Sequence, residues 1–281
     1  MALPFQAVIA EDAALIETES WHFSVAIGGG LVSNPVVDGD NLPLIVIPNL
    51  SYYGDQFFFD NGLVGYSFIQ APTIEVSIAS KINSTAAYFK DWNTESWLIT
   101  SLIPVSDGSS GSNVKTLAGA IEDTGVDKIS SEDIRDRRWS LDTGIQVNWF
   151  ASDSIDVIAN YYLDTTGVHH GENALVEVTK RFVLSKEARL QLGLGLHWQS
   201  AQLSNYYFGI HPEDGHPPSA LYLPGDTLNQ FIQVQLARKI NENWRFIFTS
   251  KLQRLDEKLK RSPIVEESKQ YSVFMGAVYD F

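Results

Sequence analysis

The chain ends with Tyr271-Ser-Val-Phe-Met-Gly-Ala-Val-Tyr-Asp-Phe281, and this segment gives the first indication of the fold class. Alternate residues of an extended strand point to opposite faces, so the odd-numbered positions here form one apolar, aromatic-rich face. Chain ends are usually polar and loosely held. An alternating strand that runs to a final aromatic residue is typical of the last strand of an outer-membrane β-barrel. The edge strand of a soluble β-sandwich would show the same pattern over this segment alone.

The composition narrows the class of protein. Hydrophobic residues make up 44% of the 281 residues and charged residues 19%, below the roughly 25% typical of globular proteins. No apolar run approaches the roughly 18 residues that a membrane-spanning helix needs, whereas a barrel needs only every second residue to be apolar. The chain has no cysteine, which excludes disulfides and thiolate sites. Its net charge of −14 argues against nucleic acid as a partner.

Period-two alternation recurs along the whole chain and predicts strands. We expect strands at 20–30, 43–53, 56–69 and 72–84, and seven more between Trp139 and the C-terminus. Because bacterial barrels prefer even strand numbers, Ser96–Ile103 is the candidate for a twelfth strand. The expected fold is all-β: a transmembrane antiparallel up-and-down barrel of about twelve strands, with ten as the alternative.

Aromatic residues mark the ends of many predicted strands. Amphipathic rings favour the boundary between lipid and water, so we expect an aromatic girdle at both edges of the apolar band. Its predicted members are Trp21, Trp139, Trp149, Trp198, Trp244 and Tyr279. Tyr279 and Phe281 are further predicted to form the C-terminal assembly signal of the barrel.

The connections alternate between short and long from residue 139 onward. Short turns at 151–154, 185–188 and 240–243 are separated by longer segments rich in Gly, Pro and charge. Outer-membrane barrels have short periplasmic turns and long external loops, and this order agrees with a periplasmic C-terminus. We therefore expect residues 20–281 to form the barrel and residues 1–19 to be an N-terminal periplasmic segment. No leader is recognisable near Met1, so we expect that an exported form has already lost it.

Charged residues on the expected inward faces are the candidate site. They are Glu75, Lys81, Asp142, Asp156, Asp164, Glu177, Arg181, Arg245 and Lys251. They could line a selective path for a small polar solute, or they could form ion pairs that fill a closed lumen. No catalytic residues, metal or cofactor are expected: a nucleophile elbow is absent, and His169-His170 with Glu172 reads as a solvent-exposed loop.

The order of several short motifs resembles the MltA-interacting protein (MipA)/OmpV family of Gram-negative outer-membrane barrels. The matching pieces are Ile27-Gly-Gly-Gly30, Asp38-Gly-Asp40, Leu42-Pro-Leu44, Tyr52-Tyr-Gly54, Ser204-Asn-Tyr-Tyr-Phe-Gly-Ile210, Leu255, Arg261-Ser-Pro-Ile-Val265 and the terminal aromatic-Asp-Phe281. Phe208 departs from the family pattern by interrupting its Tyr-Tyr-Gly element.

The resemblance implies an outer-membrane protein in contact with lipid and lipopolysaccharide, and it implies no catalytic residue. It also implies a scaffold that links a murein hydrolase to a murein synthase, with a porin-like channel as the alternative. A soluble β-barrel that binds a ligand is a third reading, which the apolar face from Leu190 to Trp198 disfavours.

Overall fold

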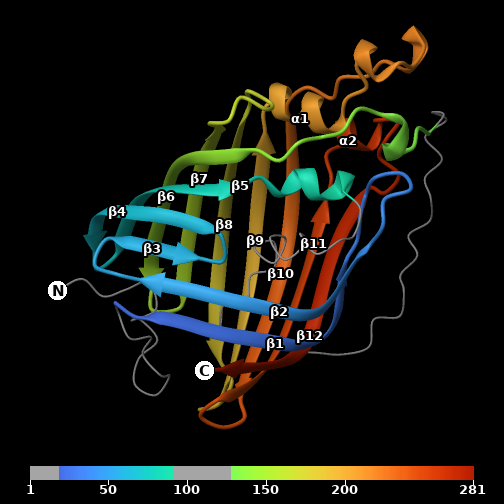
Figure 1. Ribbon diagram of the computed structural model, residues 1–281. Coiled ribbons are helices and arrows are strands. Elements are labelled where there is room, and N and C mark those ends of the chain that lie inside the picture. The colour runs from blue at the N-terminus through green and yellow to red at the C-terminus, as the bar shows by residue number, and fades with distance from the viewer. Residues whose placement is uncertain (1–18, 91–127) are drawn as a thin grey trace.

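The computed structural model describes residues 19–90 and 128–281. Within these residues, twelve antiparallel strands form one closed barrel, in which each strand pairs with its neighbours in the chain and the last strand pairs with the first (Figure 1). The strands are β1 (Trp21–Val32), β2 (Leu42–Tyr53), β3 (Phe57–Asp60), β4 (Leu63–Ala71), β5 (Ile74–Ile82), β6 (Leu141–Ser152), β7 (Ile155–Asp164), β8 (Glu172–Val183), β9 (Ala188–Gln199), β10 (Thr227–Lys239), β11 (Trp244–Arg254) and β12 (Lys269–Asp280). The predicted fold class is confirmed.

Short helices lie in the long connections between strands. They are η1 (Ser84–Phe89), η3 (Ser131–Asp133), α1 (Ala201–Phe208), η4 (Pro212–Asp214), η5 (Pro218–Ala220) and α2 (Glu257–Lys260). Both α-helices lie at the end of the barrel opposite the C-terminus (Figure 1). We call this the long-loop end, and the end that holds the tight turns and Phe281 the short-turn end. None of the helices in the described part of the chain is long and apolar enough to cross a membrane.

The prediction of one strand over 56–69 is wrong, because β3 and β4 form a short hairpin there. Asn61 and Gly62 make its turn with φ values of 47° and 91°. A two-residue hairpin turn of type I′ needs positive φ at both positions, and Asn-Gly is its strongest sequence signal. This hairpin supplies the twelfth strand. The earlier candidate, Ser96–Ile103, lies outside the described residues.

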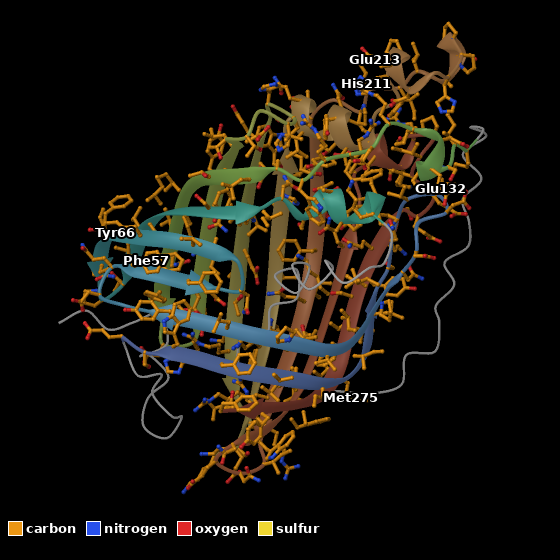
Figure 2. The ribbon with its side chains drawn as sticks, in the orientation of Figure 1. Phe57, Tyr66, Glu132, His211, Glu213 and Met275 are labelled. Atoms are coloured by element: carbon orange, nitrogen blue, oxygen red, sulfur yellow. The ribbon has the colours of Figure 1, made fainter. Side chains whose placement is uncertain are left out.

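Alternation along each strand separates an apolar outer face from an inward face. In β9, Leu194 is 62% exposed, whereas the neighbouring Gly193 is buried. Phe57 and Tyr66 pair across the β3–β4 hairpin and project from the wall, as does Met275 in β12 (Figure 2). An outer surface this rich in exposed apolar side chains is suited to lipid rather than water.

Aromatic side chains gather at the short-turn end. Trp21 packs on Tyr52 with ring centroids 5.1 Å apart, and Trp244 packs on Tyr279 at 5.0 Å. Trp149 lies near the same end of β6, and Trp198 lies near the long-loop end of β9. Trp139 differs from its predicted place: it precedes β6 and packs against the two buried apolar clusters of the barrel. Because Trp139 is partly buried among apolar side chains, it does not belong to the outer aromatic girdle.

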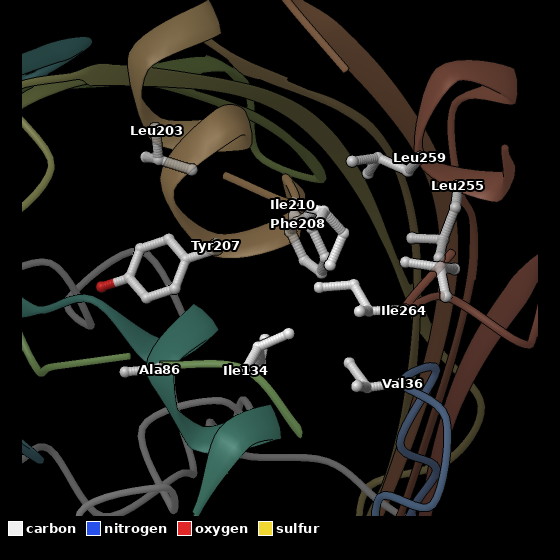
Figure 3. Close-up of a cluster of buried hydrophobic side chains, with 11 residues drawn as sticks. Val36, Ala86, Ile134, Leu203, Tyr207, Phe208, Ile210, Leu255, Leu259 and Ile264 are labelled. Carbon is white, nitrogen blue, oxygen red and sulfur yellow. The ribbon is translucent and has the colours of Figure 1, made fainter. Parts of the chain in front are cut away.

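The apolar core has two parts. One lines the inside of the wall at the closing seam, with Ala26, Ile47, Ile247, Phe274 and Val278 among its members, from β1, β2, β11 and β12. The other lies at the long-loop end and is formed by the connections rather than by the strands (Figure 3). The interior of the barrel is therefore partly filled by its own side chains.

Candidate functional site

The long-loop end is covered by a packed apolar cap. Its buried members are Val36, Ala86, Ile134, Leu203, Tyr207, Phe208, Ile210, Leu255, Leu259, Ile264 and Val265 (Figure 3). They come from the β1–β2, β5–β6, β9–β10 and β11–β12 connections. Because these connections start at points spread around the ring of strands, they meet only by reaching across the mouth. We define the cap as this cluster with the segments that carry it.

Backbone and side-chain hydrogen bonds tie the segments of the cap together. The Val37 amide donates to the carbonyl oxygen of Ile264 at 3.0 Å. The Ser262 hydroxyl donates to the carbonyl oxygen of Phe208 at 2.6 Å. Loops that share a buried core and direct hydrogen bonds form one unit. The cap is therefore a single packed unit at the long-loop end of the barrel.

A buried arginine joins the β5–β6 connection to the β9–β10 connection. The side chain of Arg137 is 1% exposed and donates from Nη1 to Asp214 at 3.3 Å and from Nη2 to the carbonyl oxygen of Gly209 at 2.9 Å. Burial alone would raise the pKa of the Asp214 carboxyl, but hydrogen bonds from the His211 amide and from Arg137 lower this pKa to about 2. Asp214 is therefore held as a carboxylate over the ordinary pH range.

Directly below the cap, Asp142 is the centre of a buried hydrogen-bond network. Its carboxylate accepts from Nδ2 of Asn83 at 2.7 Å, from Nδ2 of Asn173 at 2.8 Å and from the Ser140 hydroxyl at 3.2 Å. A fourth bond of 3.3 Å joins it to Nε2 of His169. A carboxylate offers about four lone-pair sites, so that of Asp142 is fully used by groups from four segments of the chain.

His169 is buried, which contradicts the expectation of a solvent-exposed loop. The Gly171 amide donates to its Nδ1 at 2.9 Å, so Nε2 carries the proton that points to Asp142. Asp164 accepts from the amides of His169 and His170 at 2.7 and 2.9 Å. The ligand atoms of Asp142, Asp164 and His169 lie within 4.8 Å of one another. However, a metal needs a free ring nitrogen, and both nitrogens of His169 are engaged.

Two inward lysines below the cap have no ion pair with any of the described residues. Lys81 Nζ lies 4.6 Å from the centre of the Tyr162 ring, and Lys251 Nζ lies 4.0 Å from that of Phe231. Within residues 19–90 and 128–281, neither ammonium has a carboxylate within ion-pair distance, 4.0 Å. His197 lies within electrostatic range of both.

The other predicted inward charges have protein partners. Arg181 pairs with Asp156 at 2.7 Å, and Arg245 pairs with Asp280 at 3.1 Å, both towards the short-turn end. Glu75 accepts hydrogen bonds from Ser67 and Asn148, and Glu177 accepts from Thr179 and Gln233. Of the nine candidates, three therefore lie in ion pairs: Asp156, Arg181 and Arg245. Asp142 and Asp164 are centres of hydrogen-bond networks, and Glu75 and Glu177 have neutral partners. Lys81 and Lys251 have only ring contacts among the described residues.

Several residues of this site were not predicted. Arg137, Asn83 and Tyr207 lie in the connections between strands, Tyr207 within helix α1, where period-two alternation gives no signal. His197 lies on the polar face of β9, which the period-two pattern does reveal, but a histidine there is not distinguished from its Gly and Gln neighbours. Only the pairing of distant strands brings these side chains together.

Comparisons with known proteins place the chain among outer-membrane barrels. The model of a family described as MltA-interacting protein MipA matches residues 27–281. The MltA-interacting protein of Escherichia coli (strain K12) is 22% identical over 285 residues, which cover 98% of this chain and 96% of that protein. Outer membrane protein Omp26La of Vibrio anguillarum is 32% identical over 87 residues, so the match spans 31% of this chain and 34% of that relative.

Among solved structures, an outer-membrane channel from Pseudomonas putida F1 is similar to this chain in fold. It is 10% identical, the match covers 97% of this chain and 100% of that chain, and the TM-score is 0.42.

Proposed function

Because the chain belongs to the MltA-interacting protein (MipA) family, we propose that it is a non-enzymatic adaptor that holds a murein hydrolase at the inner face of the outer membrane. The protein is located in the outer membrane, as are relatives named outer membrane proteins. Its relative in Escherichia coli is named for an interaction with MltA. A partner that acts on peptidoglycan has to be reached from the periplasm, and the short-turn end faces that side.

The cap is the observation that carries the proposal. A barrel whose external mouth is filled by a hydrogen-bonded apolar cluster is better suited to a fixed platform than to a permanently open pore. The cap occupies the long-loop end. The opposite, short-turn end is therefore the surface on which a periplasmic protein can dock. A murein synthase is the second partner that such a platform would hold.

Two neighbouring turns are the proposed contact surface. Leu184, in the β8–β9 turn, is 57% exposed, and Ile240, in the β10–β11 turn, is 61% exposed. The amide of Lys239 donates to the carbonyl oxygen of Glu187 at 2.8 Å, which holds the two turns side by side. Exposed apolar side chains on a fixed rim are typical of docking surfaces.

Site-specific photocrosslinking tests the adaptor role. A crosslinker placed at Leu184 or Ile240 is expected to capture a murein hydrolase in intact envelopes. Leu194 provides the matched control, because it is equally apolar and exposed but lies in the middle of the outward face of β9. Recovery of no murein enzyme from either turn, or equal recovery from Leu194, would contradict the proposal.

A passive channel for small polar solutes is the second candidate. It is favoured by the ammonium groups of Lys81 and Lys251, which face the lumen without an ion pair among the described residues. Planar-bilayer conductance tests it, with Arg137→Gln as the variant in which a loosened cap should raise conductance. A barrel that stays closed at every voltage and salt concentration, with and without that substitution, excludes this function.

A further inference from the structure

We propose that the lumen holds a binding site for a small oxyanion, a carboxylate or phosphate group, formed by Lys81, His197 and Lys251 beneath the cap. The inference deepens the channel candidate by naming the class of solute, and it is independent of the adaptor role. Binding at equilibrium does not require conduction, so the two can be tested separately.

The three side chains lie at one level of the barrel. Each belongs to the last four residues of a strand that runs towards the long-loop end: β5, β9 and β11 respectively. The charges of Lys81 and Lys251 act on each other, and the His197 ring lies within electrostatic range of both lysines. Like charges that gather in a confined lumen attract an anion.

The nearby carboxylates do not neutralise this cluster by contact. Asp142 stands opposite Lys81 in the β5–β6 register, but its lone pairs are used by Asn83, Asn173, Ser140 and His169. Glu177 attracts Lys251 from a distance and accepts hydrogen bonds from Thr179 and Gln233. Among the described residues, neither carboxylate reaches a lysine within ion-pair distance.

The two ammonium groups are held in place by aromatic rings, and none of their N–H donors is used by an acceptor among the described residues. Tyr162 and Phe231 present ring faces to Lys81 and Lys251, and such cation–π contacts orient an ammonium without accepting its N–H bonds. Each ammonium has three donors. Charge-assisted hydrogen bonds to a carboxylate or phosphate oxygen are the strongest use of such donors, which selects an oxyanion over a neutral solute.

The test uses the full-length barrel refolded in detergent and titrated with inorganic phosphate or with acetate at constant ionic strength in chloride. Isothermal calorimetry gives the affinity and thermal unfolding gives the stabilisation. The variants are Lys81→Gln, Lys251→Gln and the double substitution. Lys269→Gln is the matched control, because it removes the same charge from an exposed position in β12.

We expect phosphate, acetate or both to stabilise the wild-type barrel more than chloride does, and the stronger of the two identifies the ligand group. Each single substitution should weaken binding about tenfold or more, the size of one lost charge-assisted hydrogen bond. Lys269→Gln should bind as the wild type does. Without phosphate or acetate, Lys251→Gln should unfold at the wild-type temperature or above it, because the desolvation cost of the buried ammonium has been removed.

Two results would overturn the site. One is that neither anion stabilises the wild type beyond chloride; the other is that Lys81→Gln and Lys251→Gln respond to the anions as the wild type does. Unboiled gel mobility verifies that each variant is folded. A barrel that binds phosphate but never conducts supports this site and contradicts the channel candidate.

Discussion

The backbone amide of Phe281 donates a hydrogen bond to the carbonyl oxygen of Phe23 at 3.2 Å, and the two rings pack with centroids 5.0 Å apart. The last residue of the chain is thereby tied to the first strand, at the seam where β12 closes on β1. Phe281 also packs edge-on against Tyr279, with ring centroids 4.8 Å apart.

Deletion of Phe281 is expected to impair assembly more than stability. The folded barrel would lose two aromatic contacts, about 1–3 kcal/mol in total. If Phe281 belongs to the assembly signal, the amount of barrel inserted in the outer membrane should fall much further than this loss implies. Unboiled gel mobility of envelope fractions measures insertion, with Phe281→Trp as the control. Normal insertion of the truncated chain would show that Phe281 is not part of the assembly signal.

Gly28→Ala should open the closing seam. Gly28 stands opposite Gly276 in the β1–β12 register, and a Cβ added to it would lie 2.0 Å from the carbonyl oxygen of Met275. Such overpacking is expected to destabilise the barrel by about 1–3 kcal/mol. Gly29→Ala is the matched control, because a Cβ there meets no atom within 4 Å. Equal thermal unfolding of the two variants in detergent would contradict the prediction.

Asp142→Ala should be strongly destabilising. The substitution removes the acceptor of four hydrogen bonds and leaves the buried donors of Asn83 and Asn173 unsatisfied. We expect a loss of at least about 3 kcal/mol in the free energy of unfolding, since each unsatisfied buried donor contributes about 1–3 kcal/mol. Asp153→Ala, in an exposed turn, should change the stability little. Chemical unfolding in detergent distinguishes the two.

The cap should loosen in acid through Asp214. Its pKa is lowered to about 2 in the folded protein from an ordinary value of 3.8, so the folded state favours the carboxylate. The stabilisation, about 1–2 kcal/mol, is present above about pH 4 and is lost as the pH falls towards 2. Hydrogen exchange of residues 205–215 between pH 4.5 and 2 measures it.

Asp214→Asn provides the comparison for this pH effect. The amide keeps the size of the side chain but does not titrate, so the exchange protection of residues 205–215 should be weaker and independent of pH once the intrinsic exchange rate is corrected. If the corrected exchange protection of residues 205–215 in the wild type stays constant between pH 4.5 and 2, Asp214 is not the cause of the pH effect.

The barrel itself could be predicted from the sequence because its determinants are local. Outward residues must be apolar one by one, so the period of two is visible in the terminal strand and in β9 without knowledge of any partner. Turn length likewise depends on a few consecutive residues. Even the missed β3–β4 hairpin carried its signal, Asn61-Gly62, in the sequence.

The inward faces predicted charged residues of the site such as Lys81 and Asp142, but not their partners, because each partner is determined by contacts between distant segments. His169 has the sequence of an exposed loop, yet the fold buries it against Asp142. Arg181 and Lys251 are both inward cations, but only Arg181 has a carboxylate in contact among the described residues. The amino-acid sequence is therefore sufficient to predict the barrel and its two faces. The cap, the ion pairs and the two lysines that lack an ion pair among the described residues follow only from the folded structure. Ion pairs depend on distances of a few ångströms between strands far apart in the chain.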